Sequence, residues 1–309
     1  MKTYRQSTFK KPDEAVQFLE NWNQEVELLN GFKYQQLTIQ TAFGNTRVWA
    51  ANPHLVEAPT LVFFPGARTC GLFWDMDNVL APFRDNCRYY IVDVNGQPSL
   101  SDGQYLNIKS RDYGYWAAQL LDALDISKAT ILGASLGGLI CLNLCLVAPQ
   151  RVHKAILLNP AGIQPFSLSI QNLFYNILPV VWPSSTTISK FLNKAIFCAP
   201  FHQPSSAYRN LIDCYFLYVL RNHRFKGDYP APLPQHDLAR IQTDIYLILG
   251  ENDLLFPPRE TQRLAAAHIP GLRASRILPQ TGHGIETSRQ ALQLAFEFFK
   301  QASSAVVTT

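Results

Sequence analysis

The chain has 309 residues and a formal net charge of +4, with hydrophobic side chains making up 47% of it and charged side chains 16%. These proportions are ordinary for a globular protein with a sizeable core. The net charge is too small, and the Lys and Arg residues too scattered, for a nucleic-acid partner. The longest apolar run, around residues 139–148, is too short to span a membrane, so we expect a buried helix there.

The cysteine pattern and the first residues of the chain bear on the cellular compartment in which the protein is expected. The six cysteines are scattered and form no Cys-x-x-Cys pair, and the basic first residues lack the apolar segment of a secretory signal. We therefore expect a cytoplasmic protein without disulfide bonds. No His-Glu-x-x-His motif, Cys/His cluster or P-loop occurs, so we expect neither a metal nor a cofactor. Asp75 and Asp77 are expected to be solvated loop residues.

The predicted elements follow from the spacing of apolar residues. Residues 13–29 place apolar side chains on one helical stripe after Pro12, which predicts an amphipathic helix. Two alternating runs around Gly44-Asn45 predict a β-hairpin. The remaining predicted strands are residues 60–66, 89–94, 129–134, 154–162, 244–250 and 275–282, and helices are predicted at 112–126 and directly after the strand at 129–134.

Strands that are apolar on both sides and alternate with helices indicate an α/β fold, a mostly parallel central sheet flanked by helices. The alternation stops between residues 163 and 238, a stretch rich in proline and aromatic residues with a clear helix at 208–223. We interpret this stretch as a helical lid inserted between two strands; the alternative is a peripheral subdomain without an active role. The predicted organisation is an N-terminal helix packing on the core (1–30), two core parts (31–162 and 239–303), the lid (163–238) and a frayed tail (304–309).

Residues 133–137, Gly-Ala-Ser-Leu-Gly, join a predicted strand to an apolar helix. Gly-x-Ser-x-Gly in this setting is typical of a nucleophile elbow, a sharp turn that exposes the serine hydroxyl above the sheet edge. Glycine at 133 and 137 removes side chains that would collide in the turn, and the helix N-terminus directs its positive dipole at the same place. We predict that Ser135 is a nucleophile; the alternative is a helix N-cap serine.

A serine nucleophile needs a general base, and the base needs an orienting carboxylate. Both are expected at the carboxyl ends of later strands, because Ser135 emerges at that edge of the sheet. Asp253 lies just past one strand end, and His283, between two glycines, lies just past the last one. Their order along the chain is the one stated for this type of hydrolase. The rival acid is Glu251, and the alternative for His283 is a surface-loop histidine.

An oxyanion hole requires two backbone N–H groups that point at the charge developing on the substrate oxygen. We expect one from Leu136, directly after the nucleophile, and the other from Ala67, in the loop after the strand at 60–66. Arg68 beside it is either a clamp for an acidic group of the substrate or a solvated loop residue.

With these residues in place, the chain resembles the α/β-hydrolase fold superfamily over nearly its whole length, and residues 47–162 are similar to bacterial serine carboxylesterase-like members. The resemblance implies that Ser135 is the nucleophile, Asp253 the acid and His283 the base. It also implies a structural role for Asp93, in the loop that relatives carry as Asp-x-x-Gly-x-Gly-x-Ser. Relatives often have His-Gly where this chain has Pro65 and a glycine; proline cannot make that histidine's hydrogen bonds, but it fixes the backbone.

The expected activity is hydrolysis of a small-molecule ester or acyl substrate through an acyl-enzyme, without a cofactor. The same triad also fits acyl transfer, C–C or amide bond cleavage and cofactor-free peroxidation, and a slow-turnover ligand receptor is the alternative from another class. Aromatic residues of the lid are candidates for a mostly apolar acyl pocket, although most are expected to serve packing. These candidates are Phe166, Phe174, Tyr175, Trp182, Tyr215 and Tyr218.

Overall fold

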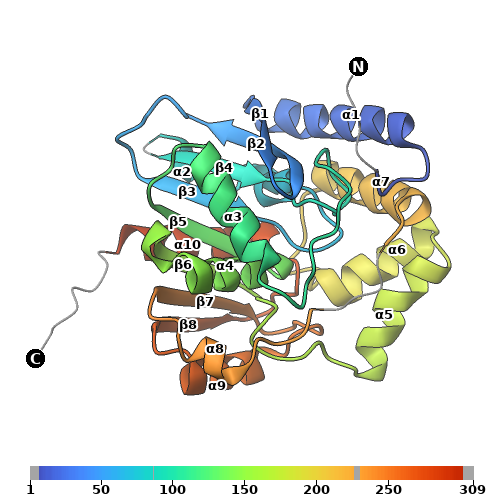
Figure 1. The fold of residues 1–309 in the computed structure, drawn as a ribbon. Helices are drawn as coiled ribbons and strands as arrows, with labels where there is room; N and C mark the ends of the chain where they lie inside the picture. Colours follow the sequence, from blue (N-terminus) through green and yellow to red (C-terminus); the bar gives the residue numbers. More distant parts are fainter. Residues whose placement is uncertain (1–6, 86, 226–229, 302–309) are drawn as a thin grey trace, which may run out of the picture.

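The computed structural model describes residues 7–85, 87–225 and 230–301, and within them an eight-stranded sheet forms the centre of the molecule (Figure 1). The strand order is β1-β2-β4-β3-β5-β6-β7-β8. β1 pairs antiparallel with β2, and β2 with β4, whereas all the other neighbouring pairs are parallel. The strands are β1 (Gln35–Thr41), β2 (Gly44–Ala51), β3 (Thr60–Phe64), β4 (Arg88–Val92), β5 (Ala129–Ala134), β6 (Val152–Leu158), β7 (Asp244–Gly250) and β8 (Leu272–Leu278).

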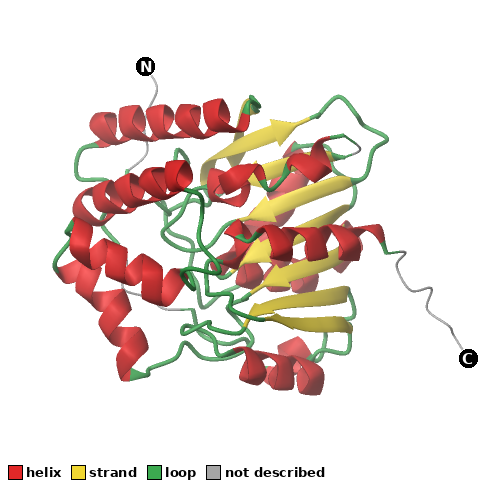
Figure 2. Cartoon of the chain, turned by 180° about the vertical axis from the view of Figure 1, so that it is seen from behind, coloured by secondary structure: helices red, strands yellow, loops and turns green. Residues whose placement is uncertain are grey.

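Helices cover both faces of this sheet (Figures 1 and 2). α1 and α10 pack on one face, and α3, α4 and α9 pack on the other. The helices are α1 (Pro12–Asn30), α2 (Ala81–Arg84), α3 (Asp112–Ala123), α4 (Leu136–Val147), α5 (Ile170–Val181), α6 (Ser185–Phe191), α7 (Ser206–Asn222), α8 (Gln235–Leu238), α9 (Pro258–His268) and α10 (Arg289–Lys300). Short helical turns are η1 (Gly71–Asn78), η2 (Pro149–Arg151), the π-helical η3 (Leu192–Ile196) and η4 (Ile285–Thr287).

The apolar strands pack in both directions, as the sequence predicted. In β3, Leu61 and Phe63 join the core on one face of the sheet, while Val62 and Phe64 join the core on the other. A strand that lies between two helical layers has no face in water, so its sequence is continuously apolar rather than alternating. The predicted mostly parallel sheet with helices on both faces is therefore present.

Several predicted boundaries were wrong; the strands predicted at 60–66 and 154–162, for example, end at Phe64 and Leu158. The hairpin turns at residues 42–43 rather than at Gly44-Asn45, because Thr41 Oγ1 accepts from Phe43 N and donates to Gly44 O, which closes the turn earlier. The helix predicted to residue 126 ends at Ala123, just before Asp125 adopts a positive φ of 52°. The last strand is β8 rather than residues 275–282, since the chain turns after Leu278 into a proline.

The chain between β6 and β7 is helical, and the described residues from 163 to 238 contain no strand, in agreement with the sequence pattern. α5, α6 and α7 lie beyond the carboxyl ends of the parallel strands (Figure 2), whereas α8 packs against α9. α1 packs against α7 and η1, so it contacts the insertion as well as the core. The tail predicted at 304–309 lies outside the described residues.

Two further findings concern the whole described chain. No helix among its residues combines the length and the apolar composition needed to cross a bilayer. The six cysteines, all of which fall within the described ranges, are free thiols.

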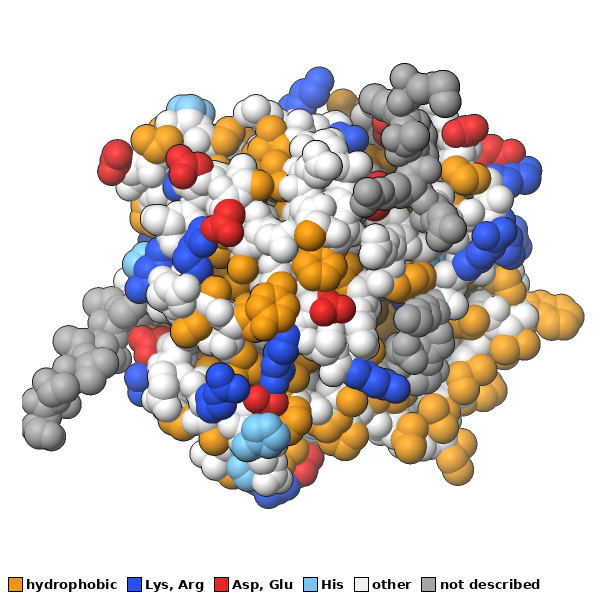
Figure 3. Space-filling view, in the orientation of Figure 1, with side chains coloured by type: hydrophobic (Ala, Val, Ile, Leu, Met, Phe, Trp, Pro, Cys, Tyr) orange, Lys and Arg blue, Asp and Glu red, His pale blue; other side chains and the backbone are white. Residues whose placement is uncertain are grey.

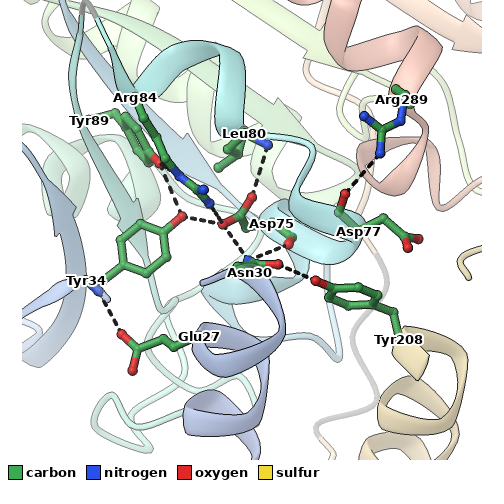
Figure 4. Close-up of polar contacts among 10 residues, drawn as sticks. All are labelled: Glu27, Asn30, Tyr34, Asp75, Asp77, Leu80, Arg84, Tyr89, Tyr208 and Arg289. Atoms are coloured by element: carbon green, nitrogen blue, oxygen red, sulfur yellow. Dashed lines mark hydrogen bonds and ion pairs between the residues drawn. The ribbon is translucent and has the colours of Figure 1, made fainter. Parts of the chain in front are cut away.

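A buried polar cluster joins α1, the sheet and the insertion (Figure 4). The Asp75 carboxylate has no exposed surface; it pairs with Arg84 Nη2 at 2.6 Å and accepts from Tyr34 Oη at 2.6 Å and Asn30 Nδ2 at 2.7 Å. Tyr208 of α7 donates to Asn30 Oδ1. The prediction that Asp75 is solvated was therefore wrong: Asn30 and Tyr34, from a distant part of the chain, join the nearby Arg84 around it, and together they make burial of the charge tolerable.

Removing the cation of this cluster is expected to destabilise the fold. Arg84→Met leaves the buried Asp75 carboxylate without its counter-charge, so the free energy of unfolding in urea falls by about 3–5 kcal/mol. The matched control is Arg263→Met, which breaks the exposed pair with Glu260 and is expected to leave the free energy of unfolding nearly unchanged, because water screens that pair. Equal losses in the two variants would contradict a structural role for the buried pair.

Candidate active site

Ser135 lies on a strained turn between β5 and α4. Its φ and ψ are 51° and −112°, a conformation that non-glycine residues rarely adopt. A methyl group added at Gly137 would lie 1.9 Å from Phe64 O, and one at Gly133 would lie 2.2 Å from Gly137 O. The backbone of Ser135 is held in place, since its N–H donates to Leu158 O at 3.0 Å and its carbonyl accepts from Ala161 N at 2.9 Å. The predicted sharp turn is thus present and requires both glycines.

The loop after β3 lies against this turn. A methyl group added at Gly66 would lie 3.4 Å from Ser135 Cβ, and Ala67 and Leu136 line the same cavity as Ser135. Two side chains hold the loop: Thr69 Oγ1 donates to Gly66 O at 2.8 Å, and Gln97 Oε1 accepts from the Arg68 amide at 2.8 Å.

These hydrogen bonds hold the loop that follows Pro65. Gln97 is a residue that the sequence did not single out, and nothing in its local pattern shows that it reaches the loop. The Arg68 guanidinium lies 5.4 Å from the centre of the Phe225 ring. Asp93 is fully buried and accepts from Gly71 N at 2.6 Å, which agrees with the structural role implied by the resemblance.

Asp253 and His283 are buried and in contact. Asp253 Oδ2 lies 2.9 Å from His283 Nδ1, and Asp253 Oδ1 accepts from the amides of Leu255 at 2.7 Å and Phe256 at 3.1 Å. These bonds fix the orientation of the carboxylate. The rival acid, Glu251, is exposed and accepts instead from the amide of residue 280. Of the two acids, only Asp253 contacts the histidine.

The surroundings of His283 favour its protonated form. Burial by itself lowers the pKa of this imidazole, but the charge and hydrogen bond of Asp253, together with the charge of Glu286, raise the pKa above its usual value. Glu286 lies three residues further along the chain, in η4, and is itself buried in the wall of the cavity. Burial raises the pKa of Glu286, while its own amide and His283 oppose that change. Sequence reasoning missed Glu286.

Two more residues outside the predicted set hold the loop that carries His283. Asn159, at the end of β6, donates to Gly282 O at 3.0 Å and His283 O at 3.1 Å and accepts from Gly250 N at 2.7 Å. Buried His202, from the insertion, accepts from Gly282 N through Nδ1 at 3.2 Å, and its Nε2 lies 3.1 Å from Thr287 Oγ1. The position of Asn159 after a buried strand was a usable signal, whereas nothing local marked His202.

A cavity of about 520 Å³ connects these parts. Ser135, His283, Ala67 and Leu136 all border it, and most of its wall is apolar. α5, α6 and α7 each contribute side chains to it. Of the six aromatic residues considered as pocket candidates from the sequence, Phe166 alone lines this cavity. Its other aromatic lining residues are Phe73, Tyr105, Tyr113, Phe191, Phe197, Phe216, Phe225 and Phe256.

Within the described ranges, no three His, Cys, Asp or Glu side chains group as a metal site would require. The polar groups at the cavity include a hydroxyl on a strained turn, an imidazole paired with a carboxylate, and nearby main-chain amides. This arrangement is suited to nucleophilic attack by the hydroxyl, with the imidazole as proton carrier.

Comparison with known proteins identifies the family. A family model described as "Alpha/beta hydrolase family" matches residues 61–294, which include Ser135, Asp253 and His283. The chain belongs to this family. Its match begins in β3 and ends in α10, so it covers the parallel part of the sheet, the insertion and the loops around the cavity.

This alpha/beta hydrolase is similar to two curated proteins of Bacillus subtilis. It is 26% identical to "Uncharacterized carboxylesterase nap" over 272 residues, which cover 88% of this chain and 87% of that protein. It is 22% identical to "Carboxylesterase YbfK" over 293 residues, covering 89% and 90% of the two chains. Among solved structures, naproxen esterase from B. subtilis superposes with a TM-score of 0.78 at 24% identity, covering 93% of this chain and 98% of that one. The α/β-hydrolase fold and the resemblance to carboxylesterase-like members, both predicted from the sequence, are confirmed.

The buried His202 is expected to make stability depend on pH. Burial lowers the pKa of His202 from 6.5 to about 4, so the unfolded chain binds the additional proton between these values. The stability associated with neutral His202 is complete above about pH 6.5 and is lost as the pH falls toward 4. Wild type is expected to lose about 3 kcal/mol more than His202→Asn between these pH values in urea unfolding. If the free energy of unfolding falls equally with pH in wild type and His202→Asn, His202 is not the source of the pH dependence.

Proposed function

We propose that the chain is a serine carboxylesterase that cleaves esters of small, mostly apolar molecules through a Ser135-Asp253-His283 triad. The main support is the combination, at one cavity, of a hydroxyl on a strained turn and a buried imidazole 2.9 Å from a carboxylate. The names of the relatives, two carboxylesterases and a naproxen esterase, agree with a hydrolase that acts on ester bonds.

The proposed reaction follows from which atoms are already engaged. Because Asp253 contacts Nδ1 of His283, Nε2 is the nitrogen that accepts the proton of Ser135 as the hydroxyl attacks the ester carbonyl. The amides of Leu136 and Ala67 stabilise the oxyanion. His283 then transfers the proton to the departing alcohol, and afterwards it activates a water molecule that releases the acid from Ser135.

The insertion acts in this proposal as the lid that shapes the acyl pocket. Side chains from α5, α6 and α7, among them Ile177, Phe191 and Phe216, border the cavity opposite the sheet. Apolar walls favour an apolar acyl or alcohol group and keep bulk water from the acyl-enzyme. The charged groups of the wall, Arg68, His283 and Glu286, lie within this mostly apolar surface.

Steady-state release of p-nitrophenol from acetate, butyrate and octanoate esters tests this function. Ser135→Ala is expected to abolish sustained turnover, and Asp253→Asn to lower kcat by about 10⁴, because the imidazole loses the partner that fixes its tautomer. Glu251→Gln is the matched acid control and keeps wild-type rates. Equal rates in wild type and Ser135→Ala would sink the assignment of the nucleophile, and a single burst without turnover would exclude water as the acyl acceptor.

The charge of Glu286 is expected to appear in the pH profile. Glu286 contributes to raising the pKa of His283, so Glu286→Gln lowers that pKa, and the neutral base persists to lower pH. The acidic limb of kcat/KM against pH, measured with p-nitrophenyl butyrate, then moves to lower pH. Glu251→Gln leaves the limb in place. An unchanged limb, or a move to higher pH, in Glu286→Gln would show that Glu286 does not act on the imidazole through its charge.

A further inference from the structure

The insertion begins with a long stretch that carries no charge. No Asp, Glu, Lys, Arg or His occurs from residue 155 to residue 189, a range that contains the end of β6, all of α5 and most of α6. An ordinary surface helix places charged side chains toward water. α5 has no charged side chain to place there, and in the structure it presents apolar side chains to water instead.

The orientation of α5 is the reverse of that of a water-facing helix. Its polar residues Asn172 and Asn176 are buried, with Asn176 Nδ2 donating to Asn172 Oδ1 at 2.7 Å and Asn172 Nδ2 donating to Ser167 O at 2.7 Å. Five of its six exposed residues are apolar, with Ile170 88% exposed and Val181 74% exposed; the sixth is Gln171. Exposing apolar surface to water while burying amides that must find partners costs stability on both sides of the helix.

These outward residues form one continuous apolar stripe, which consists of Leu168, Ile170, Phe174, Ile177, Val181 and Trp182. Figure 3 shows hydrophobic side chains gathered over α5 at the lower right of the molecule. Ile177 also lines the catalytic cavity, together with the neighbouring Val180, so the stripe extends to the cavity. A contiguous exposed apolar patch of this kind marks a surface that meets a partner.

The charge of the rest of the insertion favours one kind of partner. From residue 190 to residue 225, the insertion carries five basic side chains, Lys190, Lys194, Arg209, Arg221 and Arg224, and a single acidic one, Asp213. α6 and η3, which hold the two lysines, pack against α5. A symmetric contact with a second copy would bring two such basic surfaces together, whereas an anionic lipid surface is complementary to them.

We propose that the apolar stripe of α5 docks on the surface of an anionic phospholipid bilayer. α5 has 12 residues, too few to cross the hydrocarbon core, so it lies in the plane of the interface with the stripe among the acyl chains and the lysines of α6 and η3 near the headgroups. Trp182, at the end of the helix, is suited to the boundary between the two regions. This docking does not depend on the proposed chemistry.

Binding is measured with the Ser135→Ala full-length chain, so that no vesicle lipid is hydrolysed. Flotation with vesicles of phosphatidylcholine alone is compared with flotation on vesicles containing phosphatidylglycerol. Trp182 is an internal reporter: it is 70% exposed, whereas the other four tryptophans are at most 3% exposed. Docking is expected to shift its emission to shorter wavelength and to protect it from iodide on anionic vesicles, and Trp182→Phe removes this signal.

Three substitutions on the stripe, Ile170→Gln, Phe174→Gln and Val181→Gln, are expected to weaken partitioning by at least about tenfold without unfolding the protein, since all three side chains are exposed. Lys190→Glu with Lys194→Glu is expected to weaken binding to the anionic vesicles in the same direction.

The matched control replaces three other exposed apolar residues, Leu28→Gln, Val56→Gln and Tyr115→Gln, and keeps wild-type partitioning. Three results would overturn the proposal: no flotation of the parent chain with anionic vesicles, equal flotation with neutral ones, or equal flotation of the stripe variant. A concentration-dependent dimer, seen by sedimentation without lipid and lost in the stripe variant, would assign the stripe to a second copy instead. If the wild-type chain binds vesicles as expected but hydrolyses no ester, that result contradicts the proposed function and leaves the docking proposal standing.

Discussion

The close approach of α4 to the end of β3 is the constraint on which the site depends. A methyl group at Gly137 would lie 1.9 Å from Phe64 O, so only glycine lets the first turn of the helix pack against that strand. This contact forces the chain to reverse at Ser135, in a strained conformation, and brings Gly66 against the same serine. One steric requirement therefore sets both the exposure of the hydroxyl and the position of the loop that contains Ala67.

The features that the sequence predicted are those encoded within a few residues. The sheet follows from apolar runs, and Ser135, Asp253 and His283 each stand just past a strand, where a parallel sheet collects its loops. Glycines on both sides of the serine and of the histidine provided a second local signal that these two residues belong to the site. These positions required no knowledge of tertiary contacts, apart from the rule that carboxyl ends of parallel strands share an edge.

Two of the residues that were missed act across long separations in the chain. Gln97 holds the amide of Arg68 from a different loop, and His202 holds the His283 loop from the insertion. Asp75 was misjudged for the same reason, because its buried environment is made by α1, α2 and the segment before β1. A polar residue in a loop looks the same in a sequence whether it is solvated or satisfied by distant partners.

The insertion is tied to the rest of the molecule on two sides while one of its helices remains apolar on the outside. His202 fixes it to the loop of the histidine, and Tyr208 fixes it to Asn30 of α1. These attachments mean that α5 is not loosely placed: its amides are paired inward and its apolar side chains are held outward. The missing strand pattern and the helix at 208–223 predict a helical insertion, but a helical pattern cannot tell which side of a helix faces the core, because the pattern of an inverted helix is identical. Only burial distinguishes the two, and burial shows that the side of α5 that an ordinary helix would pack is the side left exposed.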